Sequence, residues 1–226
     1  MSLVFSVEES YVLETAIKAW VPVQFLFRED ADTIFNTKKP EVKDAKLVEA
    51  ICHLADSGMI WLKWRGERPS KVGRQDVEKV RTRRKLSKQP SLLLYGLSPK
   101  GGERWEVIAR PSWYRFVEGA FNNLRKRADL LVGELRGVKR TVVKQYMSGL
   151  QYIGFKIVGE SQRWHHLEPF RVTYWKSLPK GWRVRFRCSY SLEGDWRFEN
   201  VPAWFWGMQN WYKRSVDLFP DCFSTG

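Results

Sequence analysis

The sequence predicts an α+β protein of two domains, residues 1–132 and 133–226. Apolar residues in the first part recur at three- and four-residue intervals, which is the period of amphipathic helices. In the second part, residues 182–190 alternate apolar and polar side chains, as a half-buried strand does. With 226 residues, of which 43% are apolar, the chain can bury a substantial core. Gly133 and Gly137 bracket the predicted boundary.

The first predicted helix opens at Ser6, because Ser6 and Glu9 have the spacing of a capping box. Pro22 stops this helix. Its apolar positions are Val12, Leu13, Ala16, Ile17 and Trp20. Residues 23–27 follow as a strand or a buried connection, and residues 29–35 as a short helix.

Another helix is predicted from Pro40 to Gly58, which supplies the left-handed residue that ends it. Its expected inward face comprises Val42, Ala45, Val48, Ile51, Cys52 and Ala55. The period then changes to two, which predicts a strand over residues 60–64 and a partner strand over residues 91–97. Ser98 and Pro99 open a further helix that runs to about Ala109.

This order of elements resembles a winged helix-turn-helix domain over residues 6–109. In particular, Asp56-Ser-Gly58-Met-Ile60, followed by Tyr95-Gly-Leu97-Ser-Pro-Lys-Gly101, is similar to the turn-and-wing pattern of winged-helix proteins of the MarR and PadR kind. The resemblance implies that residues 41–57 stand in the position of the recognition helix and that the loop after residue 64 is the wing. Two features depart from that pattern: residues 41–57 carry no net positive charge, and the loop is longer than such wings usually are.

The segment at 61–90 holds most of the positive charge of the chain. It contains eleven Lys or Arg residues against three Asp or Glu residues, an excess of eight out of a total of +14. Cations crowded in this way favour a polyanion, because each neutralised phosphate releases condensed counterions. The candidate nucleic-acid contacts are Lys63, Arg65, Arg68, Lys71, Arg74, Arg81, Arg83, Arg84, Lys85 and Lys88, with Lys43 and Lys46 in residues 41–57, the segment in the position of the recognition helix. Asn36 and His53 are further candidates for reading base edges. The alternative interpretation is a solvated loop that serves only solubility.

Beyond residue 110, helices are predicted over residues 113–131 and 138–150. Strands are predicted over residues 152–158, 171–176 and 182–190, and an aromatic-rich helix over residues 202–212. The C-terminal domain is therefore expected to contain an antiparallel sheet with packed helices.

Arginine occupies alternate positions on the last predicted strand. Trp182, Val184, Phe186, Cys188 and Tyr190 are expected on one face, and Arg183, Arg185 and Arg187 on the other. These arginines would lie about 7 Å apart, close to the spacing of successive phosphates, and are a candidate secondary anion surface. The alternative is that they pair with Glu193, Asp195 and Glu199 across a hairpin.

Patterns of catalysis and metal binding are weak. Neighbouring His165 and His166 would point to opposite faces of a strand, and no thiol or carboxylate stands at ligand spacing, so no metal or cofactor is predicted. Phosphate-binding glycine loops, nucleophile elbows and dinucleotide fingerprints do not occur in the sequence. The three cysteines are widely separated, which indicates a reducing compartment, and no apolar run reaches membrane length. We therefore expect a cytoplasmic protein without a membrane partner.

These observations favour a non-catalytic nucleic-acid-binding protein with duplex DNA as its partner. A protein-protein interaction module is the alternative, for example a neutralising partner of an acidic protein that docks through its exposed Trp and Arg residues. A third interpretation, a phosphoryl-transfer enzyme, requires carboxylates clustered in a cleft.

Overall fold

The structure is a computed structural model that describes residues 5–35, 37–81, 92–123 and 131–190. The chain is an α+β protein with antiparallel sheets, and it divides into two units. Unit 1 comprises Met1–Ile108 and Thr173–Lys176, and unit 2 comprises Ala109–Val172 and Ser177–Gly226. The predicted division at residues 133–137 differs from this one, because those residues lie inside a strand, β5 (Leu131–Gly137).

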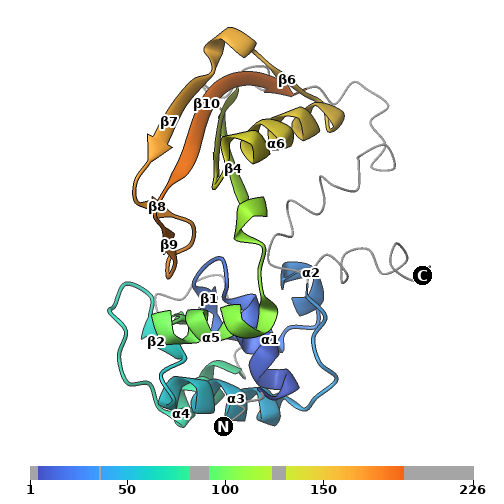
Figure 1. Ribbon diagram of the computed structural model, residues 1–226. Helices are drawn as coiled ribbons and strands as arrows, with labels where there is room; N and C mark the ends of the chain where they lie inside the picture. Colours follow the sequence, from blue (N-terminus) through green and yellow to red (C-terminus); the bar gives the residue numbers. More distant parts are fainter. Residues whose placement is uncertain (1–4, 36, 82–91, 124–130, 191–226) are drawn as a thin grey trace, which may run out of the picture. The chain divides into compact units, whose positions relative to one another are not determined.

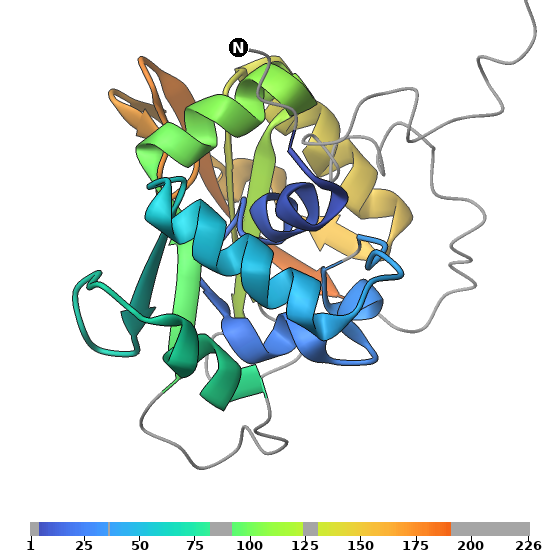
Figure 2. The ribbon, with the colours of Figure 1, turned by 90° about the horizontal axis from the view of Figure 1, so that it is seen from below.

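Unit 1 contains most of the helices, shown in blue and green in Figures 1 and 2. In chain order its elements are α1 (Val7–Thr15), β1 (Val21–Pro22), the 3-10 helix η1 (Val23–Phe27), α2 (Ala31–Phe35), α3 (Asp44–Asp56), β2 (Ile60–Trp64), α4 (Arg74–Arg81), β3 (Leu93–Leu97) and α5 (Pro99–Ala109). The three strands form an antiparallel sheet in the order β1-β3-β2.

Helix α1 begins with the predicted capping box. The Ser6 hydroxyl accepts a hydrogen bond from the Glu9 backbone N–H at 3.1 Å, and the Glu9 carboxylate accepts one from the Ser6 N–H at 2.8 Å. The helix ends at Thr15, well before Pro22, and the buried residues after it are Ala16 and Ile17. Residues 23–27 form the 3-10 helix η1, in which Val23, Gln24 and Leu26 are buried, so the segment is a buried connection and not a strand.

Helix α3 begins four residues later than predicted, and of its predicted inward face Val48 and Ile51 are buried. Lys43 is its N-cap residue. Pro40 lies in the preceding turn, and its carbonyl accepts a hydrogen bond from the Val42 N–H. The buried residues of the helix are Leu47, Val48, Ala50, Ile51 and Leu54. Leucine buries more apolar area than alanine, so the helix rotates to cover these leucines rather than the predicted Ala45 and Ala55. Gly58 follows with φ +71°, as expected for the residue that ends a helix.

The connection after residue 64, predicted as a loop, contains the helix α4. Val77 and Val80 of α4 are completely buried, and the helix packs against η1 and α3. Figure 2 shows α4 beside the longer α3. An apolar pair at i and i+3 inside a polar segment is enough to give a short helix one buried side.

Residues 173–176 were predicted as part of a strand beside residues 182–190, but they pack within unit 1 instead. The Tyr174 hydroxyl donates to the Ala16 carbonyl at 2.8 Å and accepts from the Leu97 N–H. The Trp175 indole donates to the Ile17 carbonyl at 3.0 Å. The strand that remains, β8 (Phe170–Arg171), pairs with β9 (Ser177–Leu178) and not with β10 (Gly181–Tyr190).

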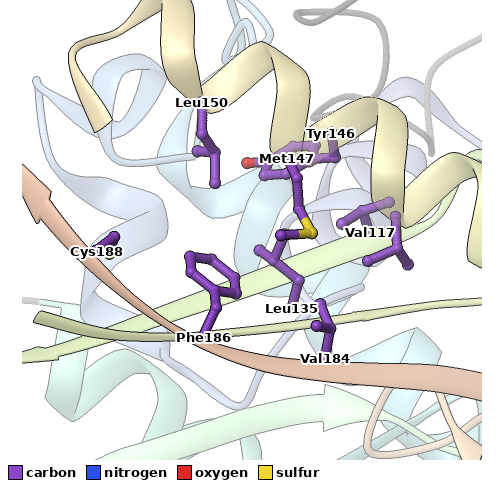
Figure 3. Close-up of a cluster of buried hydrophobic side chains, with 9 residues drawn as sticks. Val117, Leu135, Tyr146, Met147, Leu150, Val184, Phe186 and Cys188 are labelled. Carbon is purple, nitrogen blue, oxygen red and sulfur yellow. The ribbon is translucent and has the colours of Figure 1, made fainter. Parts of the chain in front are cut away.

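Unit 2 is built on an antiparallel sheet with the order β4-β5-β10-β6, in which β7 also pairs with β10. Its other elements are η2 (Trp113–Arg115), β4 (Val117–Asn123), α6 (Arg140–Tyr152), β6 (Phe155–Ile157), η3 (Gly159–Ser161) and β7 (Arg163–Leu167). Helix α6 covers one face of the sheet (Figure 1). Beneath it, Val184, Phe186 and Cys188 of β10 meet Met147 and Leu150 of α6 (Figure 3).

The predicted helix over residues 113–131 is wrong over its described part. Residues 113–115 form η2 and residues 117–123 form β4, which pairs with β5 along its whole length. The apolar residues there fit both periods, but Val117 and Phe121 also lie on one face of a strand, next to the core. Pairing with β5 decides between the two periods. The predicted helices over residues 138–150 and 98–109 correspond to α6 and α5. Residues 202–212 lie outside the described residues.

The start of α5 gives a stability test of unit 1. A methyl group at Gly101 would lie 1.9 Å from the Met59 carbonyl oxygen, which is backbone and cannot move aside. We therefore expect Gly101→Ala to lower the free energy of unfolding by about 2 kcal/mol or more, measured by urea denaturation. Gly159→Ala is the matched control, because no atom lies within 4 Å of the position of its added methyl group. Equal midpoints for the two variants would contradict the packing described here.

Candidate nucleic-acid interface

The segment between β2 and α4 presents cations on the surface of unit 1. Arg65, Arg68, Lys71 and Arg74 are exposed. Their backbone is tied to the sheet, because the Arg65 N–H donates to the Leu92 carbonyl at 2.8 Å and the Ser70 N–H donates to the Leu62 carbonyl at 3.1 Å. Within the described part of the chain, none of these four side chains forms an ion pair. Their charge is therefore available to an external anion.

Helix α4 extends this basic surface. Arg74 is its first residue and Arg81 its last. The Asp76 carboxylate accepts the Gly73 N–H at 3.2 Å, which caps the start of the helix. Arg81 is partly neutralised, since its Nε donates to Glu78 at 2.9 Å. An open hollow runs along the helix and is lined by Arg74, Gln75, Glu78, Lys79 and Arg81.

The outer face of β2 combines an aromatic ring with a cation. Trp61 is 41% exposed, and Lys63 lies two residues along the same face of the strand. The Lys63 ammonium stands 4.1 Å from the centre of the Trp20 ring, which holds it in place by a cation–π interaction. Exposed rings beside cations are typical of surfaces that contact nucleic acids.

The exposed side of α3 is less basic. Lys43 is exposed at the N-cap, and Lys46 forms an ion pair with Glu49 at 3.2 Å. His53 is exposed but its Nδ1 is hydrogen-bonded to the Glu9 carboxylate of α1. Two of the candidates on this helix are thus engaged by carboxylates of unit 1 itself.

Several candidates lie outside the described residues. These are Asn36, Arg83, Arg84, Lys85 and Lys88. The proposed partners of the arginine stripe, Glu193, Asp195 and Glu199, also lie outside the described residues.

The arginine stripe and the apolar residues of β10 lie on opposite faces of the strand, as predicted, and the arginines are on the face opposite α6. Val184, Phe186 and Cys188 are buried, whereas Arg185 and Arg187 are exposed and Arg183 is half-buried. Arg185 pairs with Glu134 of the neighbouring strand β5, at 2.6 Å. The same carboxylate accepts from Arg136 at 2.9 Å, so a single Glu134 holds two guanidinium groups.

Burial of Glu134 disfavours its charged form, but the hydrogen bonds from Arg185 and Arg136 outweigh that effect. The pKa of Glu134 is therefore lowered from its usual value. The side chain of Glu134 is only 14% exposed, while those of its partners are about half exposed. The carboxylate is ionised at neutral pH and fixes the direction of both arginines.

Lys79 of α4 and Arg136 of β5 were not among the sequence-derived candidates. Lys79 lies in the basic segment and lines the hollow along α4. This position could not be predicted because no helix was expected there. Arg136, Glu134 and Val132 stand at every second position, which is the period of one face of a strand. The pairing of this strand with residues 182–188 is not a local property of the sequence.

Among the described residues, no group of three or more His, Cys, Asp or Glu side chains is placed to hold a metal ion. His165 and His166 point to opposite faces of β7, because they pair with Arg183 and Trp182 respectively. Of the described helices, none has the length and apolar character needed to cross a membrane.

Comparisons with models of known protein families, with curated proteins and with solved structures find no match to this chain.

The lowered pKa of Glu134 leads to a pH-dependent stability difference. The pKa of Glu134 in the folded protein lies below its pKa in the unfolded chain, which is about 4.3. The stability that the Glu134 charge contributes is therefore complete above the unfolded pKa and is lost as the pH falls through the folded pKa. We expect Glu134→Gln to lower the free energy of unfolding by about 1 kcal/mol at pH 7, the range of partly exposed ion pairs. This difference should shrink below about pH 4.

Urea denaturation at several pH values measures this difference. Glu118→Gln is the control, because Glu118 is an exposed carboxylate on β4. A cost of Glu134→Gln that stays constant down to pH 2 would show that Glu134 acts through packing and not through its charge.

Proposed function

We propose that this protein is a non-catalytic nucleic-acid-binding protein and that unit 1 contacts the phosphate backbone of duplex DNA. One observation carries the proposal. Residues 65–81, the described part of the most cationic segment, include α4, which is anchored by the buried Val77 and Val80, while Arg65, Arg68 and Lys71 stay exposed and without ion pairs in the described part of the chain. A fixed surface of this kind loses less conformational entropy on binding than a solvated loop does.

The arrangement of unit 1 supports a winged-helix interpretation. The order α1, β1, α2, α3, β2, β3 and the sheet order β1-β3-β2 resemble a helix-turn-helix followed by a wing hairpin. In that interpretation α3 is the recognition helix, the β2–β3 connection is the wing, and α4 is an insertion into the wing.

The charges indicate that binding depends on the wing more than on the recognition helix. Lys46 and His53 on α3 are engaged by Glu49 and Glu9, so this helix offers little to base edges or phosphates. The exposed cations of the wing offer contacts to phosphates, which position a protein on DNA without reading its sequence. Binding is therefore expected to be strongly dependent on salt and weakly dependent on sequence.

A titration of a fluorescent 20-base-pair duplex, followed by anisotropy, tests the proposal. If the intact surface neutralises about six phosphates, affinity should fall about a thousandfold between 50 and 200 mM salt. The variant Arg65→Gln/Arg68→Gln/Lys71→Gln should reduce the slope of log affinity against log salt by about 3, since each phosphate contact contributes about 1.

The matched control is Lys100→Gln/Lys144→Gln/Lys180→Gln, which removes the same charge at exposed positions away from the basic segment. Equal losses in the two triple variants would mean that net charge alone governs binding. Absence of binding by the unchanged protein at 50 mM salt would remove the proposal, and recovery of a stoichiometric acidic protein by this surface would favour the interaction-module alternative.

A further inference from the structure

One face of the unit 2 sheet is not covered by α6 and is called the open face here. It carries further cations in addition to the arginine stripe of β10. Residues that are directly paired in an antiparallel sheet point to the same face. Arg136 of β5 is paired with Arg183, and Arg163 of β7 is paired with Arg185. Lys156 of β6 is paired with Ser189, which lies two residues after Arg187 on the same face of β10. The register therefore brings cations from four strands onto the face that α6 does not cover. These cations are Arg183, Arg185, Arg187, Arg136, Arg163 and Lys156.

The carboxylates on this face are too few to neutralise it. Among the described strands they are Glu134 and Glu118, so six Lys or Arg side chains leave an excess of four positive charges. Glu134 accepts from both Arg185 and Arg136. Within the described part of the chain, Arg183 and Arg187 form no ion pair. His165 pairs with Arg183 in the register and adds charge when it is protonated.

The spacing of these cations suits a chain of anions. Alternate residues on one strand are about 7 Å apart and neighbouring strands about 4.8 Å apart, so the guanidinium groups form a grid and not a single pocket. Arginine presents several donors in a planar fork that matches phosphate oxygens, and five of the six cations are arginines. A grid of this kind fits several phosphates along a backbone better than one small anion.

Phe, Tyr and Trp do not occur at the described positions of this face, where β4 contributes Ala120 and Asn122 and β5 contributes Val132, and His165 of β7 is its one described aromatic ring. The tryptophans of the same strands lie on the other face. There the Arg140 guanidinium stands over Trp164 at 4.8 Å and Trp182 at 5.5 Å, so these rings are already engaged. The cations of the open face therefore favour contacts with phosphates over stacking on bases.

We propose that the open face of the unit 2 sheet is a second phosphate-backbone surface, which binds nucleic acid without reading its bases. The proposal shares its ligand class with the function proposed for unit 1 but rests on different residues. Arg136, Lys156 and Arg187 are the test positions, because all three are exposed and two of them, Lys156 and Arg187, have no ion pair in the described part of the chain.

The experiment uses the full chain and the same 20-base-pair duplex. Arg136→Gln/Lys156→Gln/Arg187→Gln should lower affinity at 50 mM salt on the order of tenfold and reduce the salt slope by about 3. Arg136→Lys/Arg187→Lys keeps the charge and should retain most of the affinity, which also guards against a loss of folding in the first variant. Duplexes of unrelated sequence should bind equally.

The two proposals fail separately. If the sheet variant matches Lys100→Gln/Lys144→Gln/Lys180→Gln in affinity and slope, the second surface is refuted, whatever the unit 1 variant does. If only the sheet variant weakens binding, the second surface stands and the role of unit 1 is refuted. If Arg136→Lys/Arg187→Lys loses as much affinity for the duplex as the triple glutamine variant, a charge-based surface is refuted. The proposal is also refuted if this face binds an acidic protein in the absence of DNA and the triple glutamine variant does not.

Discussion

The burial of two valines on α4 is the constraint on which the basic surface of unit 1 depends. Val77 and Val80 are completely removed from water, and each such side chain contributes about 1.5 kcal/mol or more to folding. Neighbouring surface cations repel each other by about 1 kcal/mol at a separation of 4 Å in water, and by less at larger separations. Apolar burial therefore favours packing of α4 against η1 and α3 despite the repulsion among the cations of residues 65–81. Without it, the segment would be the solvated loop that its composition alone suggests.

Ion pairs within the protein divide its cations into two groups. Lys46, Arg81 and Arg185 are each within 3.2 Å of a carboxylate oxygen. Arg65 and Arg68 have no such partner among the described residues. The first group orients and stabilises local structure, and the second carries the charge that an external polyanion would meet. Among the described residues, the unpaired cations Arg65 and Arg68 lie between β2 and α4, whereas Lys46 of α3 is paired.

Local signals were read correctly from the sequence where few residues decide the structure. The capping box at Ser6 and Glu9, the left-handed Gly58 and the alternation over residues 182–190 each depend on contacts within a few residues or on a long periodic pattern. The α+β class followed from these signals. The exposed residues Arg65, Arg68 and Lys71 between β2 and α4 could also be proposed from charge alone.

Features decided by distant partners could not be read in this way. Residues 117–123 satisfy a helical pattern, but their pairing with β5 makes them a strand. Tyr174 looks like a strand residue, yet its hydroxyl is hydrogen-bonded to Ala16 and Leu97 in unit 1. For the open sheet face, Arg136 and Arg163 become neighbours of the arginine stripe only through the order of the strands. Sequence patterns specify which face a residue occupies, but not which strands share that face.

Hydrogen–deuterium exchange of the intact protein, with and without duplex DNA at 50 mM salt, tests the central claim most directly. The account expects slower exchange across residues 65–81 when DNA is bound, with the protection disappearing as salt releases the duplex. Unchanged exchange in this segment while the duplex remains bound would contradict a nucleic-acid surface supported by α4.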